Sequence, residues 1–259
     1  MASLRARFYN ALLRKFIRDN LLPGGEEGLK IARERMSRGG VLGALTASAE
    51  PTRQDTIHGC YSEWLGDPNA SHTLLYLHGG GYTLGSPKSH RAMVRQMCKY
   101  AGVQALVVDY RLAPENPFPA AIEDAEAAYD FLVAKGVAPE NMLLAGDSAG
   151  GGLSLALMLT LKEKGKAQPK AVALLSPWTD LTASGASLVE RADRDPMIDA
   201  TRILEVIDFY RGDEPATNPR ISPLFADLSG LPPMLVQVGT EEVLFDDSTR
   251  LVDHATPAV

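Results

Sequence analysis

The chain has 259 residues, of which 45% are apolar and 22% are charged, proportions that fit a folded globular protein and exclude a disordered one. Its formal net charge of −6 argues against a nucleic-acid partner, because such partners select basic surfaces. It has no run of about 18 apolar residues, which a membrane span needs, and only two cysteines, Cys60 and Cys98, so that a reducing, cytoplasmic location without a disulfide framework is predicted.

Two helices are predicted at the start of the chain, over about 3–19 and 25–38. The first has an apolar stripe at helical spacing and basic residues elsewhere, which is typical of a helix packed by one face on a domain. Adhesion of this helix to a membrane surface is the alternative. A loop rich in small residues is predicted to follow, as far as about residue 51.

The rest of the chain alternates short apolar runs with helical patterns. Residues 56–66 predict two antiparallel strands, or a strand and a turn. Further strands are predicted at 73–78, 103–110, 141–146, 171–176 and 233–239, and helices at 120–136, 149–164 and 246–255. This alternation is typical of βαβ units and predicts a mostly parallel sheet with helices on both faces. The interval 178–232 has helical pieces at about 186–191 and 199–211 but no convincing strand, so we expect an insertion above the sheet.

Residues 146–150, GDSAG, lie between a predicted strand and a predicted helix. The pattern G-x-S-x-G in a strand–turn–helix is typical of a nucleophile elbow, a strained turn that exposes the serine hydroxyl. The flanking glycines fit this interpretation, because side chains at 146 and 150 would collide with neighbouring backbone. A dinucleotide-binding loop does not fit, since G-x-G-x-x-G is absent here. A glycine-rich turn with an idle serine remains the alternative.

A second glycine-rich segment, HGGGY at residues 78–82, follows the strand predicted at 73–78. A serine that attacks a carbonyl creates an oxyanion, and each preorganised N–H donor that meets it contributes about 3 kcal/mol. Consecutive glycines allow bare backbone amides to turn toward such a charge, although a flexible loop is the simpler alternative. His78 is interpreted as a residue that fixes this loop by a hydrogen bond, not as a base.

Four more motifs accompany these two: YRLAPE at 110–115, FPAAIED at 118–124, DPM at 195–197 and GTEEVLFDD at 239–247. In this order and spacing, the six resemble the hormone-sensitive-lipase-like esterases, the bacterial type IV carboxylesterases of the α/β-hydrolase fold. The resemblance covers nearly the whole chain. It implies a single α/β-hydrolase domain over 1–259, with a cap formed by about 1–45 and 178–232.

The resemblance also implies the chemistry. Ser148 would be the nucleophile, and the N–H groups of Gly80, Gly81 and Ala149 would form the oxyanion hole. The reaction would be hydrolysis of short-chain acyl esters through an acyl-serine intermediate, on a small-molecule ester substrate. Amide hydrolysis or acyl transfer at the same site is an alternative. Nothing indicates a cofactor, and the scattered histidines predict no metal site.

The acid and the base are less clear. The family's acid lies in a G-x-x-D-x-L-x-D segment, where Glu242 stands in place of the usual aspartate. Glutamate can also orient and stabilise an imidazolium, so Glu242 is the candidate acid, with a solvated charge at a helix start as the alternative. The base of this fold follows the acid in the chain. His254 is the only histidine after Glu242. It is predicted roughly 12 Å along a helix that runs away from the site, so we interpret it as a surface residue.

We therefore expect a chain that is truncated at its C-terminus relative to the family and lacks the last strand and the usual base. Loss of a triad base costs up to about six orders of magnitude in turnover. Loss of the last strand would also leave strand 233–239 as an exposed sheet edge. A catalytically weak or inactive small-molecule binding protein of the same fold is thus the alternative function. The family's last strand often lies at a dimer interface, so the expected homodimer depends on that strand.

Overall fold

The computed structural model describes residues 4–18, 24–37 and 50–255. Within them, one sheet of seven strands has the order β1-β2-β4-β3-β5-β6-β7. The strands are β1 (Arg53–Ile57), β2 (Cys60–Gly66), β3 (Thr73–Leu77), β4 (Gln104–Val108), β5 (Met142–Asp147), β6 (Ala171–Leu175) and β7 (Met234–Gln237). β2 pairs antiparallel with β1 and β4, and the pairs from β4 through β3, β5 and β6 to β7 are parallel. The predicted mostly parallel sheet is confirmed.

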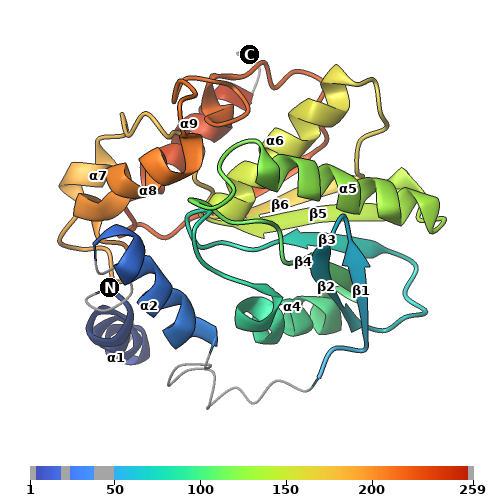
Figure 1. Cartoon of the computed structure of the whole chain (residues 1–259), viewed down its shortest axis with the longest axis horizontal. Coiled ribbons are helices and arrows are strands. Elements are labelled where there is room, and N and C mark those ends of the chain that lie inside the picture. Colours follow the sequence, from blue (N-terminus) through green and yellow to red (C-terminus); the bar gives the residue numbers. More distant parts are fainter. Residues whose placement is uncertain (1–3, 19–23, 38–49, 256–259) are drawn as a thin grey trace.

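Helices cover both faces of this sheet (Figure 1). They are α1 (Leu4–Leu13), continued by a helical turn at Arg14–Arg18, α2 (Gly25–Ser37), α4 (Pro87–Ala101), α5 (Ala120–Ala134), α6 (Ala149–Glu163), α7 (Ser187–Glu190), α8 (Ile203–Arg211) and α9 (Phe245–Ala255). Short 3-10 turns occur at Pro139–Asn141, Ala200–Arg202 and Pro223–Phe225. Helix α4 packs on one face against β2 and β4, whereas α5 and α6 pack on the other.

The sequence analysis did not predict α4. The helix begins with a capping box, in which the hydroxyls of Ser86 and Ser89 each accept the other residue's backbone N–H. It ends at Gly102, whose φ of 66° is the left-handed conformation that glycine favours. Its buried face carries Arg91, whose Nε donates to Glu63 Oε2 on β2 at 2.7 Å. A charged residue on the buried face obscures the apolar periodicity from which helices are predicted.

The first and last strands in the order of the described sheet are β1 and β7. Residues 56–66 belong to an antiparallel hairpin, in which His58 and Gly59 have φ values of 52° and 81°. Positive φ at both positions is what a two-residue type I′ turn requires. At the other edge of the sheet in the described residues lies β7, where Leu235 is 66% exposed.

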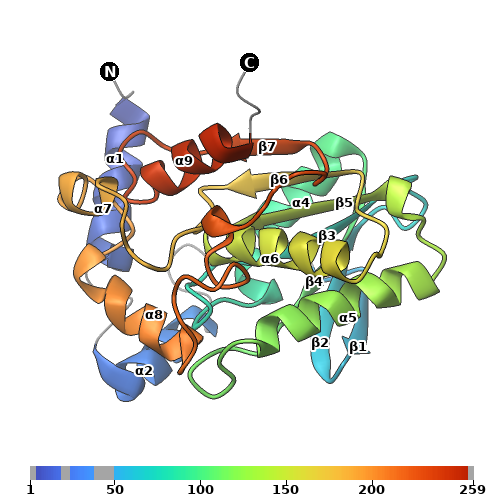
Figure 2. The same cartoon turned by 90° about the horizontal axis from the view of Figure 1, so that it is seen from above.

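The interval 178–232 contains α7, α8 and short turns but no strand, as predicted. In Figure 2, α7 and α8 lie together with α1 and α2 beyond the carboxyl ends of the parallel strands. Most of the loop predicted before residue 51 lies outside the described residues.

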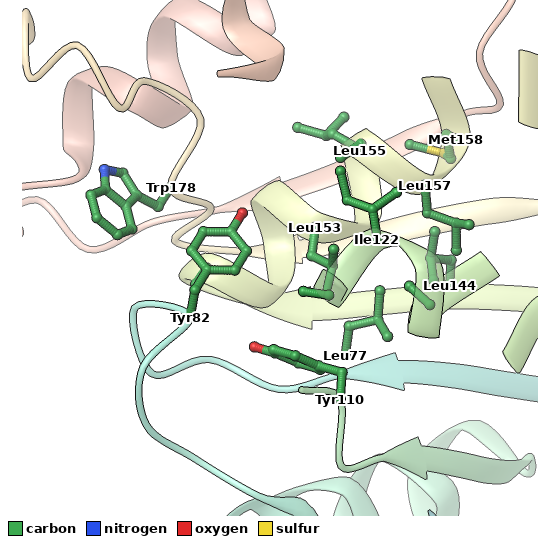
Figure 3. Close-up of a cluster of buried hydrophobic side chains, with 14 of the residues drawn as sticks. Leu77, Tyr82, Tyr110, Ile122, Leu144, Leu153, Leu155, Leu157, Met158 and Trp178 are labelled. Atoms are coloured by element: carbon green, nitrogen blue, oxygen red, sulfur yellow. The ribbon is translucent and has the colours of Figure 1, made fainter. Parts of the chain in front are cut away.

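Helix α6 is the centre of the main hydrophobic core, because every residue from 149 to 161 is buried. Figure 3 shows its leucines and Met158 packed with Leu77 and Leu144 from the sheet and Ile122 from α5. A helix enclosed on all sides has little freedom to tilt. The first turn of α6, which follows Ser148, is therefore held firmly relative to β3 and β5.

Candidate active site

Ser148 occupies the corner between β5 and α6. Its φ of 51° and ψ of −120° form a conformation that costs a non-glycine residue free energy and persists only where the surroundings enforce it. Two hydrogen bonds tie this backbone to the segment that follows in the chain after α6: the Ser148 N–H donates to Leu175 O and the Ser148 carbonyl accepts from Trp178 N, each at 2.9 Å. The side chain makes no capping bond to α6 and is partly exposed. The hydroxyl is therefore presented outward and is not used to close the helix.

The two glycines of the motif are required by close backbone contacts. A Cβ atom at Gly150 would lie 2.0 Å from Leu77 O, and one at Gly146 would lie 2.3 Å from Gly150 O. Neither distance is compatible with a side chain. The predicted steric reason for both glycines is confirmed, and the same contacts bring the end of β3 against the turn that carries Ser148.

The loop after β3 carries the remaining glycines of the site. Gly80 and Gly81 have φ values of 123° and 61°, which glycine adopts without the strain that other residues incur. Gly80 O accepts hydrogen bonds from Thr83 N and Leu84 N, at 3.1 and 2.8 Å, and these close the loop. The N–H groups of Gly80, Gly81 and Ala149 donate no hydrogen bond to any other described residue. Three backbone donors, one directly after Ser148 and two in the glycine loop, are thus unpaired within the described chain.

Asp147 joins this loop to the serine turn. Its Oδ1 accepts hydrogen bonds from Gly79 N at 2.9 Å and from Tyr76 Oη at 2.7 Å. Its Oδ2 lies 3.4 Å from Nε2 of His90 on α4. Burial raises the pKa of Asp147, but the bonds from His90, Tyr76 and Gly79 lower it by a larger amount. The net pKa therefore lies below the ordinary value. The sequence analysis assigned no role to Asp147 or His90, because one stands at a variable motif position and the other in the unpredicted α4.

His78 is fully buried behind the glycines. Its Nδ1 lies 2.8 Å from Gly79 O, and its ring stacks on Tyr110 with 4.2 Å between centroids. Burial and the neighbouring His90 lower the pKa of His78 to about 3, so its imidazole is neutral at physiological pH. The interpretation of His78 as a loop-fixing residue is confirmed.

Glu242 lies in the loop between β7 and α9. Its Oε1 accepts the N–H of Gly239 at 2.8 Å, which orients the carboxylate. The end of β7 is tied to the end of β6 by a hydrogen bond from Ser176 N to Gln237 O. Ser148 and Glu242 therefore follow strands β5 and β7 at the carboxyl ends of the parallel strands. Two strand spacings, roughly 10 Å, separate these two strands, with β6 between them.

The histidines of the chain lie elsewhere. His254 Nε2 is 2.8 Å from Ala226 O, so this ring contacts the turn at 223–226. None of the five histidines, all of which fall in the described residues, hydrogen-bonds to Ser148 or Glu242. The structure thus brings the elbow and the glycine loop together but places His254 against a different part of the molecule.

Other kinds of site find little support in the part of the chain that the structure describes. It contains no group of three His, Cys, Asp or Glu side chains arranged to hold a metal ion. Burial raises the pKa of Cys60 to about 12 and that of Cys98 to about 11, so neither thiol is a nucleophile at neutral pH. Among the helices of the described ranges, none has the length and apolar character to cross a bilayer.

Comparison with known proteins agrees with this geometry. The family model of the alpha/beta hydrolase fold matches residues 74–258. An acetyl-hydrolase of Streptomyces hygroscopicus is 44% identical over 204 residues, which span 78% of this chain and 68% of that protein. An esterase of Acinetobacter venetianus is 37% identical over 214 residues, spanning 82% of this chain and 70% of its own.

Solved structures lead to the same group. The crystal structure of an esterase from the bacterial hormone-sensitive lipase family superposes with a TM-score of 0.87 at 37% identity, covering 98% of this chain and 84% of that one. An esterase/lipase from an uncultured bacterium superposes with the same score at 38% identity, with the same coverage of both chains. This chain belongs to the α/β-hydrolase fold family and, within it, to the hormone-sensitive-lipase-like carboxylesterases.

Proposed function

We propose that this protein hydrolyses carboxylic esters of short acyl chains through an acyl intermediate on Ser148. The proposal is supported by the bond from Gly79 N to Asp147 Oδ1, which joins the glycine loop to the turn of Ser148, and by the N–H groups of Gly80, Gly81 and Ala149, which are unpaired among the described residues. Ala149 N is the first amide of a helix, where the helix dipole adds partial positive charge. Such donors stabilise negative charge on a carbonyl oxygen.

The proposed reaction has two steps. Ser148 Oγ attacks the ester carbonyl carbon, the oxyanion accepts hydrogen bonds from the three amides, and the alcohol leaves with a proton as the acyl-serine forms. Water then attacks the acyl-serine, and the carboxylic acid leaves as Oγ regains its proton. Residues 1–45 and 178–232 are proposed to form the cap over the acyl group, since the described parts of both lie at the carboxyl edge of the sheet (Figure 2).

Glu242 is proposed as the acid that would orient the imidazole of a base, a place that none of the five histidines occupies in the described structure. Its Oε1 accepts the N–H of Gly239, and Glu242 follows β7, which is two strands from the strand that ends at Ser148. His254 is held by Ala226 O, and we infer that it is not this base.

A second function is favoured by one observation. Ser148 Oγ has no hydrogen-bond partner among the described residues, so no base activates it there. A protein of this fold that binds a small molecule without turning it over would have the same geometry. The two functions differ in whether acyl transfer to Ser148 occurs.

Hydrolysis of p-nitrophenyl butyrate by the wild type, Ser148→Ala and His254→Ala tests the proposal. We expect Ser148→Ala to remove all activity above the uncatalysed rate and His254→Ala to keep the wild-type rate. Equal rates for the wild type and Ser148→Ala would reject the esterase and favour the binding protein. Loss of activity in His254→Ala would make His254 the base and show that its contact with Ala226 breaks during turnover.

Two smaller proposals remain. A homodimer is proposed from the family resemblance, and sedimentation equilibrium tests it by the mass of the particle against the chain mass of 27.9 kDa. A cytoplasmic location is proposed from the low cysteine content, and cell fractionation tests it.

A further inference from the structure

The loop that carries Glu242 is held by a buried carboxylate from the interval 178–232. Asp195 Oδ2 accepts the N–H of Val243, the residue after Glu242, at 2.8 Å. Its Oδ1 accepts the N–H groups of Met197 and Ile198 at 2.7 and 2.9 Å. Asp195 is only 1% exposed, so both oxygens are engaged away from water. Carboxylate-to-amide bonds in such surroundings are charge-assisted and stronger than neutral ones.

A second buried side chain holds the next peptide unit, between Val243 and Leu244. Ser187 Oγ donates to Val243 O at 2.6 Å and accepts from Asp246 N at 3.1 Å. The Ser187 N–H in turn donates to Asp246 Oδ2 at 2.9 Å. Val243 is thus fixed through both its N–H and its carbonyl by residues more than 40 positions earlier in the chain.

We propose that Asp195 and Ser187, together called the acid clamp, are positioning residues for Glu242. The inference rests on the role of Glu242 proposed above. The planar peptide unit that contains the Val243 N–H also contains the Glu242 Cα atom, so the bond to Asp195 fixes the backbone from which the Glu242 side chain extends. The bond from Ser187 to the Val243 carbonyl fixes the following peptide unit. The bond from Gly239 N then fixes the Glu242 carboxylate. A displacement of about 1 Å at a catalytic group can lower the rate about 100-fold.

The N-terminal segment holds the clamp from outside. Arg18 Nη1 donates to Asp195 O at 2.7 Å, and Arg14 Nη2 donates to the carbonyls of Asp193 and Arg194 at 2.5 and 2.7 Å. The turn that presents Asp195 therefore lies between the helical turn at Arg14–Arg18 and residues 238–244, the loop that carries Glu242 and is here called the acid loop. Through this turn, the position of the N-terminal helix bears on the position of Glu242.

Hydrogen exchange tests the clamp without any assay of activity. In Asp195→Ala and Ser187→Ala, we expect the amides of residues 239–246 to exchange at least about 10-fold faster than in the wild type, because the bonds that protect them are gone. The matched control is Asp199→Ala: the Asp199 carboxylate caps its own turn through Thr201 N at 3.0 Å in the same interval but does not contact the acid loop. Unchanged exchange in both clamp variants would overturn the proposal.

A double-mutant cycle separates positioning from stability. We expect Asp195→Ala to lower kcat for p-nitrophenyl butyrate about 100-fold with little change in KM, and to have no further effect in a Glu242→Gln background. Asp195→Asn keeps one acceptor oxygen and should recover part of the rate.

The same fold loss in both backgrounds would overturn the positioning role. If Glu242→Gln alone leaves kcat unchanged, the proposed acid is wrong and the positioning role fails with it. The esterase function itself is judged separately, by Ser148→Ala.

Discussion

The two sides of the site are built in different ways. On the nucleophile side, Ser148 and the glycine loop follow β5 and β3, central strands with partners on both sides. They meet through backbone atoms packed so closely that a single Cβ at Gly150 would overlap Leu77 O. On the acid side, Glu242 follows β7, the last strand of the described sheet, and its neighbour Val243 is held by the side chains of Asp195 and Ser187, far away in the chain.

This difference decides what each side tolerates. A Cβ atom at Gly150 would lie 2.0 Å from a backbone oxygen, and backbone cannot move aside as the end of a side chain can. The nucleophile side therefore depends on the absence of side-chain atoms at this position. The acid side depends on the presence of particular polar atoms, and a change there leaves buried donors without partners. The first kind of change should distort the fold, whereas the second should displace one functional group.

The largest effect is therefore expected for Gly150→Ala. The new methyl group would overlap Leu77 O, and we expect a loss of about 3 kcal/mol in the free energy of unfolding, together with loss of Ser148 labelling by a fluorophosphonate. Urea unfolding and the labelling rate measure the two effects. Gly165→Ala is the control: it has a φ of 62° but open space around it, so only a backbone strain of about 1 kcal/mol is expected. Equal losses in the two variants would contradict the packing argument.

Asp147→Ala tests the polar part of the nucleophile side. It removes the acceptor of Gly79 N and Tyr76 Oη, so the glycine loop should lose its alignment with Ser148. We expect kcat to fall about 100-fold, the effect of losing one oxyanion donor. Steady-state kinetics with p-nitrophenyl butyrate measures the change. A rate within threefold of the wild type would mean that the loop keeps its position without this carboxylate.

His90→Gln should have a smaller effect that depends on pH. Burial lowers the pKa of His90, but Asp147 raises it more, so the net pKa lies above the ordinary value. The charged pair is complete below this raised pKa and is lost as the pH rises through it. The ratio of wild-type to variant kcat should thus be largest at low pH and approach one at alkaline pH. A constant ratio across the pH range would exclude a role of the imidazolium charge.

The same contrast explains how much could be predicted from the sequence. The glycines at 146 and 150 and the loop at 79–81 are predictable, because a backbone that excludes Cβ atoms permits one residue type at fixed spacing. The alternating strands and helices are predictable for a similar local reason. Asp147 and Asp195 were not assigned roles, since their bonds to Gly79 and Val243 join distant segments and leave no periodic signal. Helix α4 was missed because a buried ion pair interrupts its apolar face.

A buried carboxylate on α9 gives the last and smallest prediction. Asp247 Oδ1 accepts the N–H groups of Thr179 and Asp180 at 2.7 and 2.9 Å, yet burial outweighs these bonds and raises the pKa of Asp247 to about 7. Asp147, buried on the nucleophile side, has its pKa lowered instead, because the hydrogen bonds from His90, Tyr76 and Gly79 outweigh its burial. Opposite pH dependences of stability are therefore expected from the two carboxylates.

The sign for Asp247 follows from proton binding. Between the ordinary pKa of about 3.9 and the raised value near 7, the folded protein retains a proton that the unfolded chain has released. The contribution of Asp247 to stability is thus complete below about pH 4 and is lost as the pH rises to about 7.

Asp247→Asn, whose carbonyl oxygen still accepts both N–H groups, should flatten this part of the profile of unfolding free energy against pH. Urea unfolding at pH 5 and pH 8 measures the slope. Asp227→Asn, at an exposed carboxylate paired with Lys162, should leave the slope as in the wild type. If Asp247→Asn also leaves it unchanged, Asp247 is ionised in the folded protein, and both sides of the site hold their buried carboxylates in the charged form.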